Sequence, residues 1–152
     1  MIAIVNGKVY TITHGTLEKG VVLIEGKKIV EVGENVTIPA GTQVIDAAGK
    51  VVFPGLIDAH CHAGIFNDGV GWEHADGNET SDPITPHLRA LDAVHPEDLA
   101  FPDIISAGVT TILTGPGSAN LIGGQWICIK TAPRASIEEM ILQEPAGMKM
   151  AL

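Results

Sequence analysis

Residues 44–62 read VIDAAGKVVFPGLIDAHCH, and this stretch decides how the rest of the chain is interpreted. Before Pro54-Gly55 the sequence consists of short apolar runs separated by turn residues. After it, an apolar run that begins at Leu56 ends in the polar side chains of His60 and His62. Such a run is typical of a buried parallel strand whose carboxyl end faces a functional site. The stretch therefore predicts a boundary between two kinds of structure.

The part of the chain before this boundary, residues 1–53, predicts a β-rich domain. Short strands are expected at residues 2–5, 9–13, 21–25, 28–32, 43–46 and 51–53. Asn6-Gly7 predicts a hairpin turn between the first two of them. Short strands at this spacing indicate a β-sandwich or a β-roll.

The part after the boundary, residues 54–152, predicts strands that alternate with helices, so the fold class is α/β. A helix is expected after His95, ending near Gly108, and a strand follows at 109–113. Strand, helix, strand is the βαβ unit of a parallel sheet. A third strand is expected at 125–130, and helices at 137–142 and 146–152.

The pair His60 and His62 carries the strongest chemical signal in the chain. Residues i and i+2 of a strand point to the same face, so both imidazoles can converge on one metal ion while Cys61 points into the packing. Imidazole is a common ligand of Zn²⁺ and similar ions. Cupin-type sandwiches also use His-x-His, but they need a glutamate four or five residues later, where this chain has Phe66 and Asn67.

The stretch 44–62 resembles the signature of the amidohydrolase superfamily, and residues 78–87, 115–120 and 123–125 are similar to its imidazolonepropionase-like branch. The resemblance implies a composite β-sandwich followed by a (β/α)8 TIM barrel. Residues 1–53 would then form the N-terminal part of the sandwich, and residues 54–152 the first βα units of an incomplete barrel. Barrel strand 1 would end at His60–His62, and strand 2 would lie near 109–114.

The resemblance also implies the roles of single residues. His60 and His62 would bind one or two divalent metal ions, with zinc as the expected metal. Asp58 would not bind the metal itself, but would hold the ligands in place or assist folding. The family needs a bridging lysine or glutamate, two further histidines and a catalytic aspartate from later strands. Since no histidine follows residue 95, and a barrel takes ~250 residues, we expect a truncated or split portion that carries no catalytic residue of its own.

In complete form such a protein would hydrolyse a C–N bond of an amide, a cyclic amide or an amidine-like group, using water activated by the metal. The isolated chain is expected to be inactive. A non-catalytic assembly or binding module, or a pseudoenzyme fragment, stays open as the alternative, and metal binding by the histidine pair distinguishes the two.

Two further regions lie near the predicted site. The long polar segment 64–86 and the residues just after it contain four candidates for a substrate loop, although a solvated loop is the alternative for each: His74, Glu79, Asp82 and His87. Residues 115–118 predict a tight turn at a strand end, near the active-site face. Trp72 and Trp126 are expected to pack rather than to contact a cofactor.

The composition narrows the possible partners. A net charge of −9 with scattered basic residues argues against nucleic-acid and membrane surfaces. The two cysteines form no disulfide framework, and no signal peptide is recognisable, so a cytoplasmic protein is expected. The family resemblance implies a small-molecule substrate. An incomplete barrel leaves an open sheet edge, which predicts self-association or a complementary chain.

Overall fold

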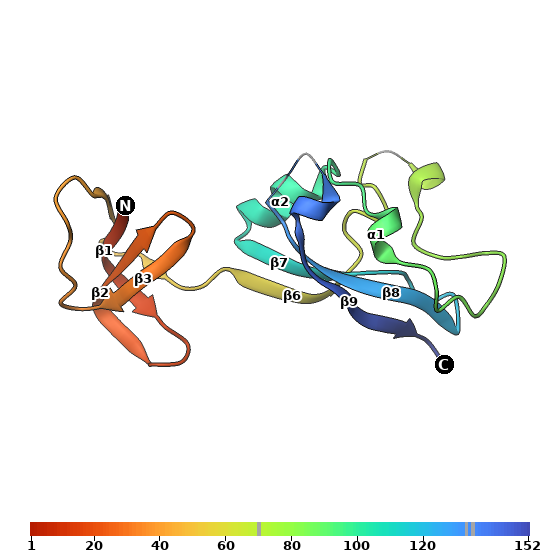
Figure 1. Cartoon of the computed structure of the whole chain (residues 1–152), viewed down its shortest axis with the longest axis horizontal. Helices are drawn as coiled ribbons and strands as arrows, with labels where there is room; N and C mark the ends of the chain where they lie inside the picture. The colour runs from red at the N-terminus through yellow and green to blue at the C-terminus, as the bar shows by residue number, and fades with distance from the viewer. Residues whose placement is uncertain (70, 133, 135) are drawn as a thin grey trace. The chain divides into compact units, whose positions relative to one another are not determined.

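The computed structural model describes residues 1–69, 71–132, 134 and 136–152. Contacts within the chain divide it into two compact units, Met1–Pro54 and Gly55–Leu152 (Figure 1). Each unit has its own β-sheet. The change from one unit to the next falls at Pro54-Gly55, the dipeptide at which the sequence pattern also changes.

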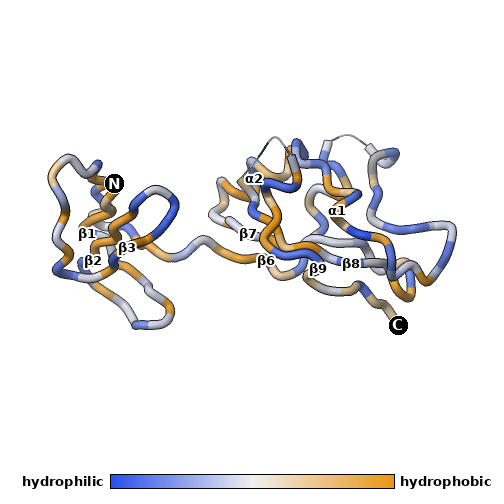
Figure 2. The backbone as a smooth tube through the Cα atoms, viewed as in Figure 1, coloured by the Kyte–Doolittle hydropathy of each residue, from blue (hydrophilic) through white to orange (hydrophobic). Residues whose placement is uncertain are grey.

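The first unit contains one five-stranded sheet of mixed direction. Its strands are β1 (Ile2–Tyr10), β2 (Thr16–Glu25), β3 (Lys28–Gly33), β4 (Gln43–Asp46) and β5 (Val51–Val52). β1 pairs with β2 in antiparallel direction and with β4 and β5 in parallel direction, while β3 pairs with β2. Figure 2 shows hydrophobic stretches along β1 to β3 and hydrophilic ones in the connecting loops. The β-rich prediction is confirmed, and a second layer of a sandwich stays a prediction.

The hairpin turn predicted at Asn6-Gly7 is wrong, because β1 continues through it. Asn6 has a φ of 63°, and the pairing with β2 shifts its register around this position. Asparagine tolerates the left-handed conformation, which suits a β-bulge as well as a hairpin turn. The hairpin closes instead at residues 11–15, where the backbone N–H of Thr11 donates to the carbonyl of Gly15 at 3.0 Å.

The second unit contains a four-stranded sheet in the order β6-β7-β8-β9. Its elements are β6 (Leu56–Cys61), η1 (Trp72–His74), α1 (Ala90–Ala93), α2 (Ala100–Ser106), β7 (Val109–Thr114), β8 (Ile122–Lys130), η2 (Ile137–Glu139) and β9 (Ile141–Met150). β6 and β7 are parallel, and β8 is antiparallel to both β7 and β9. The expected βαβ unit is confirmed by β6, α2 and β7, and α2 is followed by Gly108 at a φ of 87°.

The core of the second unit lies between its sheet and the two short α-helices. α1 contacts β8 and α2 contacts β7 on the same side of the sheet (Figure 1). The buried cluster draws side chains from the strands, the helices and the loop after β6: Ile65, Ala90, Val94, Phe101, Ile112, Ile127, Ile129 and Met140. This packing covers one face of the sheet and fixes β7 and β8 as its central strands.

The prediction that β6 is buried is wrong. Leu56 is 49% exposed and Ile57 is 71% exposed. β6 is an edge strand that pairs with β7 only, and the helices contact β7 and β8 instead. Its apolar residues therefore lie at an open edge among the described residues, although the strand itself is placed where the sequence predicts it.

The helices predicted at 137–142 and 146–152 are also wrong. The described chain has a 3-10 turn, η2, and then the long strand β9, which pairs with β8. Local propensity favours a helix here, but pairing with a central strand overrides it. Pro145 lies where the pairing of β9 with β8 shifts register between Gln143 and Gly147, a position at which a missing N–H is tolerated.

The barrel itself stays a prediction. The strand expected at 125–130 exists as part of β8, but it runs antiparallel to β7. Only residues 115–121 connect the two strands, and a parallel crossover needs about a dozen residues or more. Within the described part of the chain, the second sheet has four strands and does not close on itself.

Candidate metal site at the end of strand β6

His60 and His62 lie together at the carboxyl end of β6. His60 belongs to the strand, and His62 follows Cys61, its last residue. Their ring centroids are 5.5 Å apart and the rings are nearly perpendicular, at 85°. His60 is exposed and His62 is half-buried. The structure therefore brings the two predicted ligands side by side on one face of the strand.

The hydrogen bond of His62 fixes which ring nitrogen is free. Its Nδ1 lies 2.7 Å from the carbonyl oxygen of Gly115, the residue that follows β7. A carbonyl oxygen only accepts, so Nδ1 carries the hydrogen and donates it. In the neutral ring the lone pair then remains on Nε2, as in many histidines that bind metals.

Trp126, on β8, packs against both histidines. Its ring centroid is 4.8 Å from that of His60 and 5.7 Å from that of His62. The side chain is buried, so the prediction that it serves packing is confirmed, but its partners include the two candidate ligands. Sequence analysis missed this contact because β8 lies two strands away from β6 in the sheet.

Asp58 acts on the backbone of the site. Its Oδ1 accepts a hydrogen bond from the backbone N–H of His60 at 3.0 Å. The carboxylate is exposed and lies two residues before His60 on the same strand. This contact holds the peptide that carries the first histidine, and the wider supporting role expected for Asp58 stays a prediction.

Cys61 takes the opposite side of the strand. It packs against the buried cluster of the second unit, as predicted. Burial raises the pKa of its thiol, since the thiolate would lose hydration. Cys61 is therefore a packing residue and does not add a ligand to the histidine pair.

Glu79 and Asp82, two of the substrate-loop candidates, use their carboxylates within the loop. Glu79 Oε1 accepts from the backbone N–H groups of Thr80 and Ser81, each at 2.8 Å. Asp82 Oδ1 accepts from the N–H of Ile84 at 2.8 Å. The bonds from Ser81 are the main cause of a lowered pKa at Glu79. Both side chains shape the loop, and contact with a substrate stays a prediction.

A buried amide holds this loop in place. Asn120, which is 4% exposed, donates from Nδ2 to the carbonyls of Glu79 at 2.7 Å and Asp82 at 3.0 Å. Of the other two candidates, His87 is exposed, and the side chain of His74 lies outside what the structure describes. No local pattern pairs residue 120 with a loop about 40 residues earlier in the chain.

Asp98 organises the segment that follows His62. This carboxylate is 6% exposed and accepts three backbone hydrogen bonds, from Gly64 at 2.9 Å, Asp68 at 3.1 Å and Ala100 at 2.9 Å. It joins the loop after β6 to the start of α2. In the sequence it shows only as an acidic residue suited to a first helical turn, and that signal does not reveal its partners.

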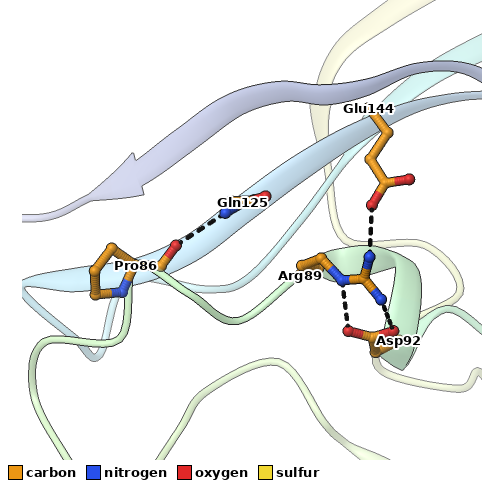
Figure 3. Close-up of polar contacts among 5 residues, drawn as sticks. All are labelled: Pro86, Arg89, Asp92, Gln125 and Glu144. Carbon is orange, nitrogen blue, oxygen red and sulfur yellow. Dashed lines mark hydrogen bonds and ion pairs between the residues drawn. The ribbon is translucent and has the colours of Figure 1, made fainter.

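Arg89 attaches the segment before α1 to the sheet (Figure 3). Its guanidinium donates to both carboxylate oxygens of Asp92, at 2.9 and 2.7 Å, and lies 3.5 Å from Glu144 of β9. Gln125 Nε2 donates to the carbonyl of Pro86 at 3.2 Å. Hydrogen bonds from Arg89 lower the pKa of Asp92. These contacts keep the second half of the long loop on β8 and β9.

A groove runs beside His60 on the same side of the sheet as Trp126. It is lined by Ala59, His60, Leu113, Trp126 and residues 147–150 of β9. Lys149 Nζ lies 5.6 Å from the centroid of the Trp126 ring, a cation–π distance. A cationic side chain from β9 therefore shares this groove with His60.

The donor set fits part of a divalent-metal site. Two imidazoles lie side by side, and Nε2 of His62 has a lone pair in the neutral ring. Catalytic zinc sites use three protein ligands. Among the described residues, no group of three or more His, Cys, Asp or Glu side chains lies close enough to hold a metal. His60 and His62 can thus supply two ligands, and a complete site requires more.

Comparisons with known proteins place this geometry in a family. The chain is 39% identical over 116 residues to the amidohydrolase TasK of Hapsidospora irregularis, covering 74% of this chain and 12% of that protein. It is 49% identical over 63 residues to a dihydroorotase of Streptococcus thermophilus, covering 41% of this chain and 14% of that protein. No protein-family model matches the chain.

A solved structure matches nearly all of the chain. An amidohydrolase from Thermotoga maritima is 43% identical, with a TM-score of 0.91 over 99% of this chain and 38% of that one. This chain belongs to the amidohydrolase superfamily. It spans between 12% and 38% of the length of these three proteins. The imidazolonepropionase-like branch stays a prediction.

Members of this amidohydrolase superfamily typically use divalent metals. In the described part of the chain, no helix is long and apolar enough to cross a membrane.

Proposed function

We propose that His60 and His62 supply two ligands of a divalent-metal site that, once completed by further ligands, hydrolyses a C–N bond. The observation that carries the proposal is the hydrogen bond from His62 Nδ1 to the Gly115 carbonyl, beside the ring of His60. It leaves Nε2 of His62 available as a metal ligand. Zinc is the expected metal, although Fe²⁺ and Mn²⁺ suit the same donors.

The described residues would divide the work as follows. A divalent ion would lower the pKa of a bound water and polarise the substrate carbonyl. His60 and His62 bind, Gly115 orients the second ring, and Asp58 holds the peptide of the first. The expected substrate is a small molecule with an amide, a cyclic amide or an amidine-like group. Similarity to an amidohydrolase and to a dihydroorotase supports this class.

Metal titration of the 152-residue chain tests the proposal. Co²⁺ is a suitable probe because its visible absorption reports the ligands directly. We expect measurable binding that falls at least about 100-fold in the His60→Ala/His62→Ala variant, since even residues that only support ligands change affinity 10- to 100-fold. His14→Ala, an exposed histidine of the first unit, is the matched control. Equal affinity of the double variant and the control would refute the proposal.

Lys149 is a candidate for the bridging lysine that the family resemblance implies. It lines the groove that contains His60, on the strand that ends the sheet. An ammonium has no free lone pair, so the amine must be neutral or carboxylated to bind. If Lys149 ligates, Lys149→Gln lowers Co²⁺ affinity; if its charge only repels the ion, the same change raises it. We expect a decrease.

The edge of β6 supports the partner part of the proposal. Leu56 and Ile57 are exposed, and β6 pairs on one side only among the described strands. Open, apolar strand edges favour pairing with another chain. We therefore propose self-association or a complementary chain, in a cytoplasmic protein, and a monodisperse monomer in light scattering would contradict it.

A non-catalytic assembly or binding module is the second candidate. It is favoured by the same exposed edge and by the lack of a three-ligand cluster among the described residues. Under this alternative, the histidine pair serves packing and Co²⁺ affinity does not depend on it. The pure chain is expected to show no C–N hydrolysis in either case, so metal affinity is the measurement that separates them.

A further inference from the structure

The two candidate ligands need orientation from within the sheet, because β6 is its edge strand. His60 is exposed, and β6 has no described neighbour on its outer side. A free imidazole on such an edge samples several rotamers, and binding an ion restricts both rings at an entropic cost. Contacts that restrict the rings beforehand reduce this cost, and β7, β8 and the loop after β6 are the neighbours that can supply them.

Trp126 supplies such a contact to both rings at once. Its indole meets His60 at 81° and His62 at 60°, with centroids 4.8 and 5.7 Å away. These edge-to-face distances are within the range of favourable aromatic pairs. Phe66 also contacts His62, with ring centroids 5.6 Å apart. His62 thus contacts two aromatic rings, and His60 contacts the indole.

Gly115 is what allows the indole to reach across β7. A Cβ at this position would clash with the Cγ, Cδ1 and Cδ2 atoms of Trp126. The same residue presents its carbonyl to His62 Nδ1. One glycine therefore leaves the space for Trp126 and selects the tautomer of His62, and both effects act on the same pair of ligands.

We infer that Trp126 is a positioning residue for His60 and His62, acting through the gap at Gly115 to hold both rings in the orientation that binds a metal. This inference rests on the proposed function, since it presumes that the pair binds an ion. Trp126 touches the ligands and not the reacting atoms. Its effect is to lower the cost of ordering the ligands.

The chain offers a matched pair of tryptophans for the test. Trp126 is 5% exposed, whereas Trp72, the only other tryptophan of the sequence, is 82% exposed. Trp126→Leu keeps an apolar side chain without a ring, and Trp126→Phe keeps a ring. Trp72→Phe is the control, and it leaves Trp126 as the single fluorophore.

Co²⁺ titration of the 152-residue variants, with far-UV circular dichroism as a check on folding, gives the readout. We expect Trp126→Leu to weaken binding about 10-fold or more, by analogy with residues that orient ligands. Trp126→Phe should restore most of the affinity, and Trp72→Phe should change none of it. A purely structural role for Trp126 would affect leucine and phenylalanine variants alike and would leave the absorption bands of bound Co²⁺ unchanged.

Each result bears on one claim. If Trp126→Leu binds as tightly as the parent while His60→Ala/His62→Ala does not bind, the positioning inference fails and the proposed site stands. If the histidine variant binds as tightly as the parent, the proposed function fails. If Trp126→Leu does not fold, the fluorescence of the Trp72→Phe variant provides the test. Co²⁺ must then quench Trp126 emission with the same affinity that the absorption change gives. Absence of quenching overturns the inference.

Discussion

Two polar regions of the second unit, the end of β6 and the loop after it, differ in which side-chain atoms already take part in hydrogen bonds. At the end of β6, His62 uses one ring nitrogen in a hydrogen bond and keeps the other free. In the loop after it, Glu79 and Asp82 accept hydrogen bonds from the backbone N–H groups of residues that follow them. The loop is richer in charged residues, but one carboxylate oxygen of Glu79 and one of Asp82 already bind the loop backbone. A candidate site is better judged by what its side chains contact than by the density of polar residues.

The supports of the two regions also differ. The histidine pair is held by elements of the sheet, through Gly115 after β7 and Trp126 on β8. The loop is held by the side chains of Asn120 and Arg89 and, in its second half, by backbone hydrogen bonds to β8. Sites on sheets are placed more precisely than sites on loops. We therefore assign metal binding to the end of β6 and a structural role to the loop.

The largest expected effect tests that assignment directly. We expect His60→Ala/His62→Ala to weaken Co²⁺ binding at least about 100-fold, and Glu79→Gln/Asp82→Asn to change it less than about 3-fold, because removed ligands cost more than their supports. Isothermal titration of the parent, the two double variants and the control His14→Ala measures both effects. If the loop variant loses affinity as strongly as the histidine variant, the loop carboxylates contribute to the metal site and the two regions do not differ in function.

Asp98 provides the next largest effect, on stability. Its buried carboxylate satisfies three backbone N–H groups around the loop after β6. Asp98→Ala would leave the N–H of the buried residue Gly64 without a partner, which costs about 1–3 kcal/mol, whereas water can reach the N–H groups of Asp68 and Ala100 more easily. We expect the free energy of unfolding of the second unit to fall by about 3 kcal/mol. Urea denaturation measures it, with Asp103→Ala, on the exposed side of α2, as control.

An unchanged midpoint for Asp98→Ala would show that water replaces the carboxylate. Asp98→Asn separates charge from shape, since its amide oxygen can still accept while its NH₂ group cannot. The asparagine variant is expected to lie between the parent and the alanine variant.

Several features of the fold were predictable from local sequence alone. Strands with apolar runs between clear turn residues were placed correctly, as at β2, β3 and β4, where Gly26-Lys27 forms the tight turn between β2 and β3. The βαβ unit followed from the spacing of β6, Gly108 and β7. These signals are local, since each depends on residues within one turn or one strand.

The errors arose where distant pairing decides the structure. Residues 141–150 include good helix formers, yet they form the strand β9 because they pair with β8. Asn6 suits a hairpin turn and a bulge equally, and only the position of β2 selects the bulge. The exposure of β6 depends on which strands flank it, which the apolar pattern of Leu56 and Ile57 does not contain.

The candidate site divides in the same way. His60 and His62 were found from spacing on one strand, because the i, i+2 rule is local. The turn at Gly115 was expected near this face, but its bond to His62 and the contacts of Trp126 and Asp98 were not found, because each reaches the pair or its loop from another element. Sequence located the donors, and the structure identified what orients them.

A smaller effect is expected at Asn120. Its amide joins two carbonyls of the loop, and its Oδ1 has no protein partner among the described residues. Asn120→Asp would replace the donor with a carboxylate that faces the carbonyls of Glu79 and Asp82. We expect a loss of about 1–3 kcal/mol in the free energy of unfolding, with little change in Co²⁺ affinity. Equal losses of stability and affinity would show that the loop and the histidine pair are coupled.

The smallest effect concerns pH and the loop carboxylate Glu79. Its pKa is lowered mainly by hydrogen bonds from Ser81, so the ionised form favours the folded loop. The resulting stability is present above the unfolded pKa of about 4.3 and is lost as pH falls through the lower folded value. Glu79→Gln removes this ionisation while keeping an acceptor oxygen.

The variant should therefore be less stable than the parent near pH 7 and lose less stability between about pH 5 and pH 3, so that the two agree closely at the acid end of this range. Thermal unfolding followed across this range measures the difference, with Glu34→Gln, an exposed glutamate of the first unit, as control. If the difference between parent and Glu79→Gln does not depend on pH, the carboxylate is not held by its backbone. Glu79 Oε1 would then be free to bind another group, and this residue would no longer differ from the histidines at the end of β6 in that respect.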